Sequence, residues 1–434
     1  WGALFGGAIT SVLFNIPGEP WSVATTFDGH PMAQQGKAGE ALTAAFTGSF
    51  LGAFVAILLI TFMSPLVARF ALQYGPAEFF SVYLLAFCSF VGMSKASPFK
   101  TIASMMLGFA LACVGLDSVS GNLRLTFGSN ELMRGFDFLV AVIGLFGIGE
   151  ILLSMEEKLS FHGGVAKINP KVVLQTWAQL PRYWVTALRS AFIGCWMGVT
   201  PGGATPASFM SYGLAKRFSP RRANFGKGEP EGIIAPETAD HSAGTSALLP
   251  MLSLGIPGSA TAAVMMGGLM IWGLNPGPTL FIEQKDFVWG LIASMYLGNI
   301  VAVILVLLTV PIFAALMRVP FFIIAPLIFI ICVVGAYSVS NSYLDVMLMM
   351  GFGVVGYLFK KLDYPIAPLV LAIVIGDKAE DAFRQSMLMS KGSMGIFFAN
   401  TLVTTLVLIG IVLLVLPLIM GLMGRRARKA VPVE

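Results

Sequence analysis

The chain has 434 residues, of which 56% are hydrophobic and 11% are charged, and its formal net charge is +5. A soluble domain usually carries about 25% charged residues, so this composition argues against a soluble protein. Apolar runs long enough to cross a bilayer recur along the whole chain. The basic residues lie mostly in short loops between these runs, which indicates cytoplasmic loops rather than binding to nucleic acid. The composition predicts an all-α polytopic membrane protein.

The first half opens with an apolar segment over residues 1–27 that is broken at Pro17-Gly18. A polar loop is expected over residues 28–40. Four spans follow, with a polar connector over residues 117–135 between the last two. The expected spans cover residues 42–68, 79–93, 99–116 and 136–153.

A hydrophilic segment over residues 154–186 separates the two halves of the chain. The second half begins with two broken apolar runs, and a charged loop over residues 216–240 is expected between them. Uninterrupted spans follow, and the chain ends in the basic tail Arg425-Arg426-Ala-Arg428-Lys429. The broken runs cover residues 187–215 and 246–273, the spans cover 287–316, 320–340, 343–359 and 395–423, and an apolar piece (364–376) and an amphipathic connector (377–384) lie before the last span.

Basic loops give a self-consistent orientation when the C-terminal tail is placed in the cytoplasm. Residues 187–215 must then enter and leave by the same face, as a re-entrant hairpin. The loops that follow the matching Pro-Gly segments of the two halves face opposite sides, which is typical of an inverted-topology repeat. We therefore expect a first repeat over residues 1–153, a cytoplasmic connector over 154–186 and a second repeat over 187–434.

The repeat makes a further prediction about the start of the chain. In the second half, the hairpin element at Pro201-Gly202 precedes the element at Pro257-Gly258, whereas nothing precedes Pro17-Gly18 in the first half. We expect that roughly one hairpin of sequence belongs before residue 1.

Three Pro-Gly elements interrupt apolar runs and are followed by small hydroxyl residues. Proline removes a backbone donor and glycine frees the dihedral angles, so we expect a helix to break at each. In lipid, a broken helix is tolerated only where it lines a cavity or is buried in protein. The half-helix after each break offers N–H donors and positive potential to an anion. The predicted substrate-binding residues are Asn15, Pro17, Gly18, Ser22 and Thr25; Pro201, Gly202, Thr205 and Ser208; and Pro257, Gly258, Ser259 and Thr261.

Alternative roles exist for these residues. A single Pro-Gly pair often only allows close helix packing, and Ser or Thr often bonds back to a helix carbonyl. Three such elements, two of them repeated, favour a binding site. Asn15 adds a side-chain carbonyl as a possible Na⁺ ligand. Arg189, Glu237 and Asp240 flank the second-half elements and are expected on solvated loop faces.

Cysteines and histidines indicate neither a disulfide framework nor a metal site. All four cysteines lie in apolar runs, which is typical of small core residues. The three histidines are far apart in sequence and lack the spacing of metal ligands, so no metal is assigned to them. No resident cofactor is expected.

Longer motifs surround two of the Pro-Gly elements. The first motif runs from Gly2 to Glu19 and continues as Asp28-Gly-His-Pro-Met-Ala-Gln-Gln-Gly36. The second runs from Phe225-Gly-Lys-Gly228 to Leu254-Gly-Ile-Pro-Gly-Ser-Ala260, and Gly335-Ala-Tyr-Ser-Val-Ser-Asn341 is a third. Through these motifs, nearly the entire chain resembles the large membrane subunit of the tripartite tricarboxylate transporter family.

The resemblance implies a secondary carrier in a bacterial inner membrane. It would work with a smaller membrane subunit and with a periplasmic binding protein that delivers a carboxylate, and it would be coupled to a gradient of Na⁺ or H⁺. We expect ion-coupled symport of a di-, tri- or aromatic carboxylate, by alternating access of the elevator type. The alternative is a passive channel or facilitator for small anions. The sequence contains none of the hydrolase, zinc-protease or phosphate-loop motifs, so an enzyme is not expected.

Overall fold

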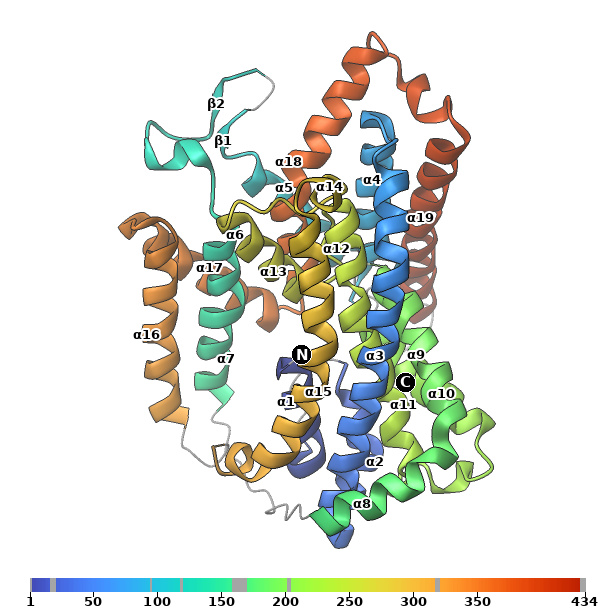
Figure 1. The fold of residues 1–434 in the computed structure, drawn as a ribbon. Coiled ribbons are helices and arrows are strands. Elements are labelled where there is room, and N and C mark those ends of the chain that lie inside the picture. Colours follow the sequence, from blue (N-terminus) through green and yellow to red (C-terminus); the bar gives the residue numbers. More distant parts are fainter. Residues whose placement is uncertain are drawn as a thin grey trace. The chain divides into compact units, whose positions relative to one another are not determined.

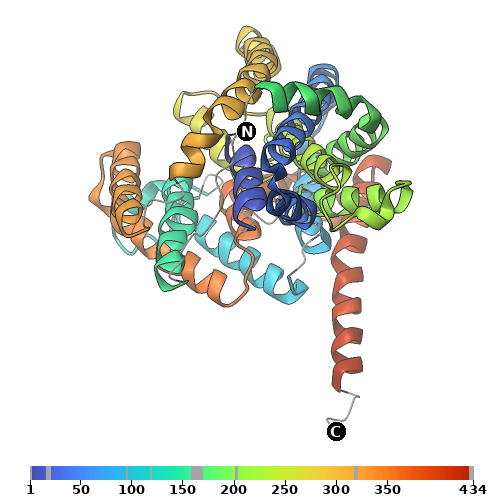
Figure 2. The same cartoon turned by 90° about the horizontal axis from the view of Figure 1, so that it is seen from below.

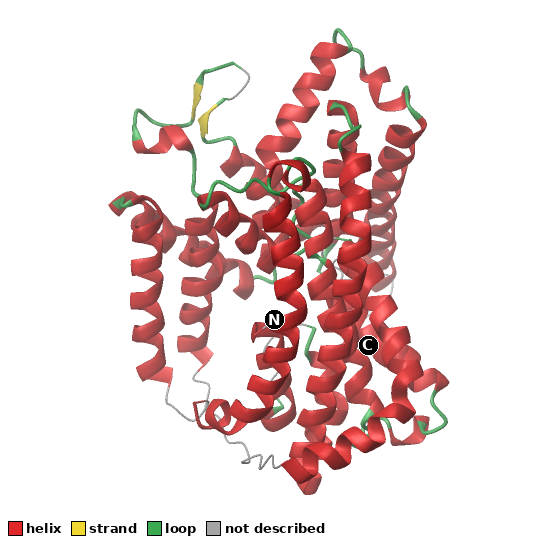
Figure 3. Cartoon of the chain, in the orientation of Figure 1, coloured by secondary structure: helices red, strands yellow, loops and turns green. Residues whose placement is uncertain are grey.

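The computed structural model describes residues 2–15, 21–93, 96–117, 120–157, 170–200, 204–316 and 321–429. These residues are almost entirely helical (Figure 3). Their only sheet pairs two strands of two residues each, β1 (Gly115–Leu116) and β2 (Leu123–Arg124), in antiparallel register. Six helical stretches in this part of the chain are long and apolar enough to cross a membrane. The predicted all-α polytopic membrane fold is confirmed.

Two compact units alternate along the sequence. The first unit comprises Trp1–Arg69, Ser160–Gly258 and Pro276–Pro320, and the second comprises Phe70–Leu159, Ser259–Asn275 and Phe321–Glu434. This division follows tertiary packing, whereas the division into residues 1–153, 154–186 and 187–434 follows the expected repeat. The repeat division stays a prediction.

The first unit contains helices from both the N-terminal and the middle parts of the chain. Its elements are α1 (Gly2–Phe14), α2 (Val23–Met32), η1 (Ala33–Lys37), α3 (Ala38–Ala71), α8 (Pro170–Gln179), η4 (Leu180–Tyr183), α9 (Trp184–Val199), α10 (Ala204–Phe218), η5 (Arg222–Asn224), α11 (Glu231–Ser246), α12 (Leu248–Leu254), α14 (Leu280–Glu283) and α15 (Lys285–Leu316) (Figure 1).

The second unit holds the remaining helices and the small hairpin. Its elements are α4 (Pro76–Met93), α5 (Pro98–Ala112), β1, β2, η2 (Glu131–Arg134), α6 (Phe138–Val142), η3 (Ile143–Ile148), α7 (Gly149–Glu157), α13 (Ala260–Ile271), α16 (Phe321–Ser340), α17 (Tyr343–Lys361), α18 (Ile366–Met389), η6 (Met394–Phe398) and α19 (Thr401–Lys429). Helices α4, α5 and α18 pack together, and α17 packs on α6, η3 and α7.

Three segments differ from the sequence prediction. Residues 28–40, expected as a loop, lie in a helical stretch that runs through α2, η1 and α3 and kinks at Gly36, which has a φ of 78°. The expected charged loop over residues 216–240 contains the start of α11. The expected break between residues 376 and 377 does not exist, because α18 is one continuous helix. Hydropathy misses the start of α11 because its polar residues are buried in protein, and it misses the other two helical segments because several of their polar residues are exposed.

Helix α11 lies at the centre of the first unit, and all of its residues except Gly244 are buried. Helices α9 and α10 pack against each other and against α11 (Figure 1 and Figure 2). On α9, Gly194 and Gly198 lie directly against Ala239 and Ala243 of α11. Small residues four positions apart let two helix backbones approach closely, which is the usual way for membrane helices to associate.

A second pair of glycines brings α3 onto another face of α11. A Cβ atom added at Gly48 would lie 3.0 Å from the hydroxyl oxygen of Thr238 and 3.2 Å from the carbonyl oxygen of Ile234. One added at Gly52 would meet the backbone of Thr238. Helix α11 is therefore enclosed by two glycine-bearing helices, and its charged side chains are held away from lipid.

Candidate functional site

The helix break expected at Pro257-Gly258 is confirmed. Helix α12 ends at Leu254, its C-cap Gly255 has a left-handed φ of 70°, and α13 begins at Ala260. Pro257 and Gly258 are both buried. Ser259 caps α13, because its hydroxyl oxygen accepts a hydrogen bond of 3.1 Å from the backbone N–H of Ala262.

The other two Pro-Gly pairs, Pro17-Gly18 and Pro201-Gly202, lie outside the described residues. Each pair nevertheless falls between two separate helices, α1 and α2 in the first case and α9 and α10 in the second. Thr205 lies in the first turn of α10, and its side chain is outside the described part. Asn15 is exposed just after α1, with a φ of 58°. Thr261 is exposed on α13.

Within the first unit, the structure brings the three elements together in pairs. The hydroxyl of Ser208, on α10, donates a 2.7 Å hydrogen bond to the carbonyl oxygen of Trp21, just before α2. The neighbouring Ser22 is buried, and its carbonyl oxygen accepts a hydrogen bond of 3.1 Å from Ser11. A Cβ atom added at Gly258 would lie 3.2 Å from the carbonyl oxygen of Gly198, near the end of α9. The hairpin element therefore lies next to both of the others.

Thr25 connects the first element to α11. Its hydroxyl donates a hydrogen bond of 2.6 Å to Oε1 of Glu237, and Ser49 on α3 lies 3.1 Å from Oε2 of the same carboxylate. Glu237 is 1% exposed. The expectation that Glu237 and Asp240 lie on solvated loop faces is wrong, because both are buried on α11.

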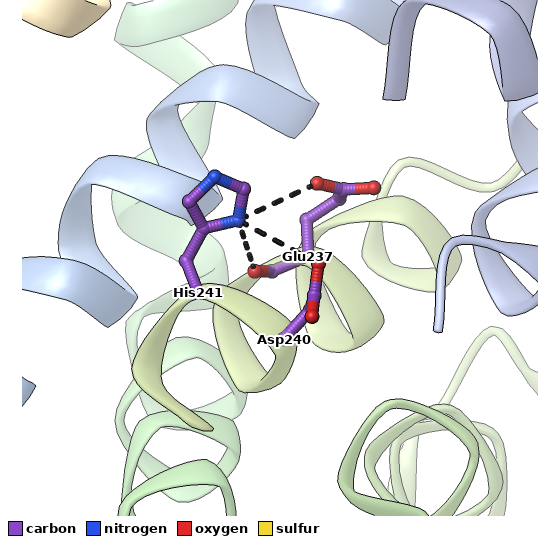
Figure 4. A group of neighbouring side chains, drawn as sticks. All are labelled: Glu237, Asp240 and His241. Carbon is purple, nitrogen blue, oxygen red and sulfur yellow. Dashed lines mark hydrogen bonds and ion pairs between the residues drawn. The ribbon is translucent and has the colours of Figure 1, made fainter. Parts of the chain in front are cut away.

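His241 lies beside these carboxylates. Its Nδ1 is 3.9 Å from Oε2 of Glu237 and 3.9 Å from Oδ2 of Asp240, and 3.3 Å from the backbone carbonyl oxygen of Glu237 (Figure 4). The ring of Phe5, from α1, packs on the imidazole with 4.6 Å between centroids. Glu237, Asp240 and His241 are all buried and each has a potential ligand atom within 4.8 Å of the others.

Asp28 fixes the loop before α11 onto α2. Its Oδ1 accepts hydrogen bonds from the backbone N–H groups of Gly226, Gly228 and Glu229, at 2.8, 3.0 and 2.9 Å. Its Oδ2 accepts one of 2.9 Å from the hydroxyl of Tyr212. The side chain is completely buried. The sequence motifs that begin at Asp28 and at Phe225 therefore pack against each other.

A second polar group surrounds the start of α11. Glu231 accepts hydrogen bonds of 2.6 Å from both Thr186 and Ser219. Burial, with a contribution from the nearby Glu229 carboxylate, raises the pKa of the Tyr183 hydroxyl, which stays protonated and donates to Glu229 at 3.3 Å. Arg221 lies over the Tyr183 ring and 3.5 Å from Glu229. Arg221 therefore offsets part of the negative charge of Glu229 and Glu231.

The sequence profile of the tripartite tricarboxylate transporter TctA family matches residues 1–371. The chain belongs to this family. Over 430 residues, 98% of the chain and 85% of the relative, it is 33% identical to an uncharacterized 52.8 kDa protein of the TAR-I ttuC' 3' region of Agrobacterium vitis. It is 34% identical over 234 residues, 54% of the chain and 97% of the relative, to an uncharacterized protein of the TAR-II ttuC' 3' region of the same organism. No solved structure matches the chain.

As a member of the TctA family, the chain is a multi-pass membrane component of a tripartite tricarboxylate transporter.

Among the residues of the candidate site, the prediction from sequence missed Ser49, Asp28 and the role of α11. A signal for α11 was present in the four-residue spacing of Ala235, Ala239, Ala243 and Ala247. Arg189 also differs from expectation, since it is half-buried on α9 with its guanidinium over the ring of Phe218.

Proposed function

We propose that this chain is the carrier subunit of an ion-coupled uptake system for a di-, tri- or aromatic carboxylate. It acts in the inner membrane of a bacterium, with its C-terminus in the cytoplasm. A small membrane subunit completes the membrane part, and a periplasmic binding protein delivers the substrate. The observation that carries the proposal, beyond family membership, is the pairwise approach of the three Pro-Gly elements.

In this proposal, helix N-termini bind the substrate anion. No lysine or arginine lies within the three Pro-Gly motifs. Backbone amides and hydroxyls at helix starts, among them those of α2 and α10 in the first unit, would therefore supply the donors, and each helix end contributes up to about 2 kcal/mol in a partly buried setting. The co-transported cation offsets the charge of the substrate. Ser22, Thr25, Thr205, Ser208, Ser259 and Thr261 are the hydroxyl residues assigned to this role.

Alternating access is the proposed transport mechanism. An elevator mechanism requires motion of one body of the transporter against another. Two inverted repeats with re-entrant tips would produce such a pair of bodies. A facilitator would need no such motion, and it would only equilibrate its substrate across the membrane.

Uptake into proteoliposomes tests the proposal. The three components are combined, and labelled di-, tri- and aromatic carboxylates are offered under separately imposed gradients of Na⁺ and H⁺. We expect accumulation of one class against its gradient, and loss of accumulation when an ionophore dissipates the coupling gradient. Equilibration without accumulation would instead identify a facilitator.

A matched pair of variants tests the site. Ser259→Trp should abolish uptake, because the indole fills the start of α13. Ser342 caps α17 in the same way, with its hydroxyl oxygen 3.1 Å from the N–H of Leu344, but lies outside the three elements. Ser342→Trp should therefore retain uptake. Equal uptake by both variants, at equal amounts of folded protein, would show that Ser259 is not part of the substrate-binding site.

A further inference from the structure

Glu237 is a buried carboxylate whose neighbours are hydroxyls and a histidine. Within the described part of the chain, its side chain contacts Thr25, Ser49 and His241, and no lysine or arginine forms an ion pair with it. Burying an ionised carboxylate is strongly unfavourable unless a cation compensates it. Glu231, on the same helix, differs because Arg221 lies 3.9 Å from its carboxylate.

The contacts of His241 leave carboxylate and hydroxyl oxygens as the ligand atoms beside Glu237. The two distances of 3.9 Å from Nδ1 to the carboxylates are too long for hydrogen bonds. Nδ1 is 3.3 Å from the carbonyl oxygen of Glu237, and since a carbonyl only accepts, Nδ1 carries the hydrogen in this contact. This nitrogen is then no metal ligand. The remaining ligand atoms are oxygens, which suit hard cations rather than zinc or copper.

The hydroxyl of Ser49 points to a cation between it and Glu237. Its oxygen lies 2.9 Å from the carbonyl oxygen of Ala45 and 3.1 Å from Oε2 of Glu237. A serine has one hydroxyl hydrogen, so it satisfies one of these acceptors at a time. When the hydrogen faces Ala45, a lone pair faces the carboxylate, and a proton or a metal cation shared by the two oxygens makes that approach favourable.

Thr238, the residue that follows Glu237 on α11, has a second buried hydroxyl that needs an explanation. Its hydroxyl is completely buried and has no hydrogen-bond partner among the described residues. It faces Gly48, the residue next to Ser49, because a Cβ atom added at Gly48 would lie 3.0 Å from it. A buried hydroxyl without a partner in a native protein calls for an unassigned group nearby.

We propose that Glu237 and Asp240, with the hydroxyls of Thr25 and Ser49, bind the coupling Na⁺; this rests on the proposed function as a symporter. A proton binds to a single oxygen lone pair. Here oxygens from three helices, α2, α3 and α11, converge, as they would around a metal ion. Magnesium keeps several waters and calcium takes six to eight oxygens, so the smaller set of oxygen-bearing side chains here fits Na⁺ better. Because Thr25 lies on the helix that follows the first Pro-Gly element, the bound ion orders that helix for the substrate.

Ion binding by the purified full-length chain tests the site apart from transport. Thermal unfolding and tryptophan fluorescence are followed in detergent while Na⁺ replaces K⁺ at constant ionic strength. We expect a saturable Na⁺-specific stabilisation of the wild type. In Glu237→Gln the half-saturating Na⁺ concentration should rise at least about tenfold, or the response should vanish. Glu231→Gln changes another buried carboxylate of α11 and should keep the wild-type response.

Ser49→Ala is the second variant, in case Glu237→Gln does not fold. It keeps the carboxylate and should raise the half-saturating Na⁺ concentration several-fold. A wild type without a Na⁺-specific response, or with uptake driven by a proton gradient in the absence of Na⁺, would overturn the proposal. An unchanged response in both Glu237→Gln and Ser49→Ala would do the same. A Na⁺ response that Glu237→Gln abolishes, without carboxylate accumulation, would uphold the ion site and reject the symport function.

Discussion

Thr25 and Glu237 lie 212 positions apart in the chain and are joined by a hydrogen bond of 2.6 Å. The bond connects α2, which follows the first Pro-Gly element, to the buried polar helix α11. Helix α11 has a second hydroxyl partner in Ser49 and close backbone contacts with two glycine-bearing helices. The consequence is a carboxylate deep in the first unit whose setting depends on three helices at once.

Removing the hydroxyl of Thr25 should destabilise the first unit. In Thr25→Val the shape is kept, but Oε1 of Glu237 loses its donor, which should cost about 1–3 kcal/mol. Thr25→Ser keeps the hydroxyl and should lose much less. Denaturant unfolding in detergent without Na⁺ measures both variants. Equal stability of the two would show that the hydrogen bond contributes little to the fold.

Asp28→Asn should destabilise the chain more than Tyr212→Phe. The aspartate accepts three backbone hydrogen bonds and one from Tyr212 while completely buried. Replacing it with a neutral amide weakens all four, at a cost of about 2–5 kcal/mol, whereas Tyr212→Phe removes one, at about 1 kcal/mol. Limited proteolysis of the 219–230 loop gives a local measurement. Slower cleavage of Asp28→Asn than of the wild type would contradict the role of Asp28 as an anchor.

Two glycine-to-alanine changes should have opposite effects. A Cβ atom at Gly198 would lie 2.5 Å from Cα of Ala243, so Gly198→Ala must push α9 away from α11, at about 1–3 kcal/mol. Gly213, on α10, has nothing within 4 Å of an added Cβ atom. Gly213→Ala should therefore stabilise the helix by up to about 1 kcal/mol. Melting temperatures measured side by side test the pair, and a drop of similar size in both would disprove the packing argument.

The sequence was sufficient for the fold class, because apolar runs of spanning length are a direct consequence of the bilayer. The break at Pro257-Gly258 was also predictable, since proline and glycine act locally on the backbone. Helix α11 was not predicted, because its average polarity is that of a loop and its burial is created by glycines on α3 and α9. The hydrogen bond between Thr25 and Glu237 could not be predicted either, because it depends on packing between segments that are distant in the sequence.

Asp28 is a second residue whose role could not be predicted from the sequence. The motif that begins with it pointed to a polar loop, yet the residue lies inside a helix and its partners are backbone groups of residues 226–229. Backbone N–H groups carry no signature in a sequence. A carboxylate that binds them can therefore be located only when the fold is known.

In the second unit, Arg384→Gln should be much more harmful than Lys361→Gln. Arg384 lies 2.9 Å from Oδ2 of Asp117 and 2.6 Å from Oε1 of Glu380, and Asp117 is 5% exposed. Without the guanidinium, a buried carboxylate loses an ion-pair partner, which should cost about 2–4 kcal/mol. Lys361 pairs at 2.7 Å with Glu156 at an exposed position, where solvent and salt screen the interaction, so its loss should have no measurable effect. Unfolding at low and high salt distinguishes the two cases, because the effect of Arg384→Gln should persist in high salt. If salt removes the difference between Arg384→Gln and the wild type, the pair behaves as a surface contact and the buried charge of Asp117 is compensated in another way.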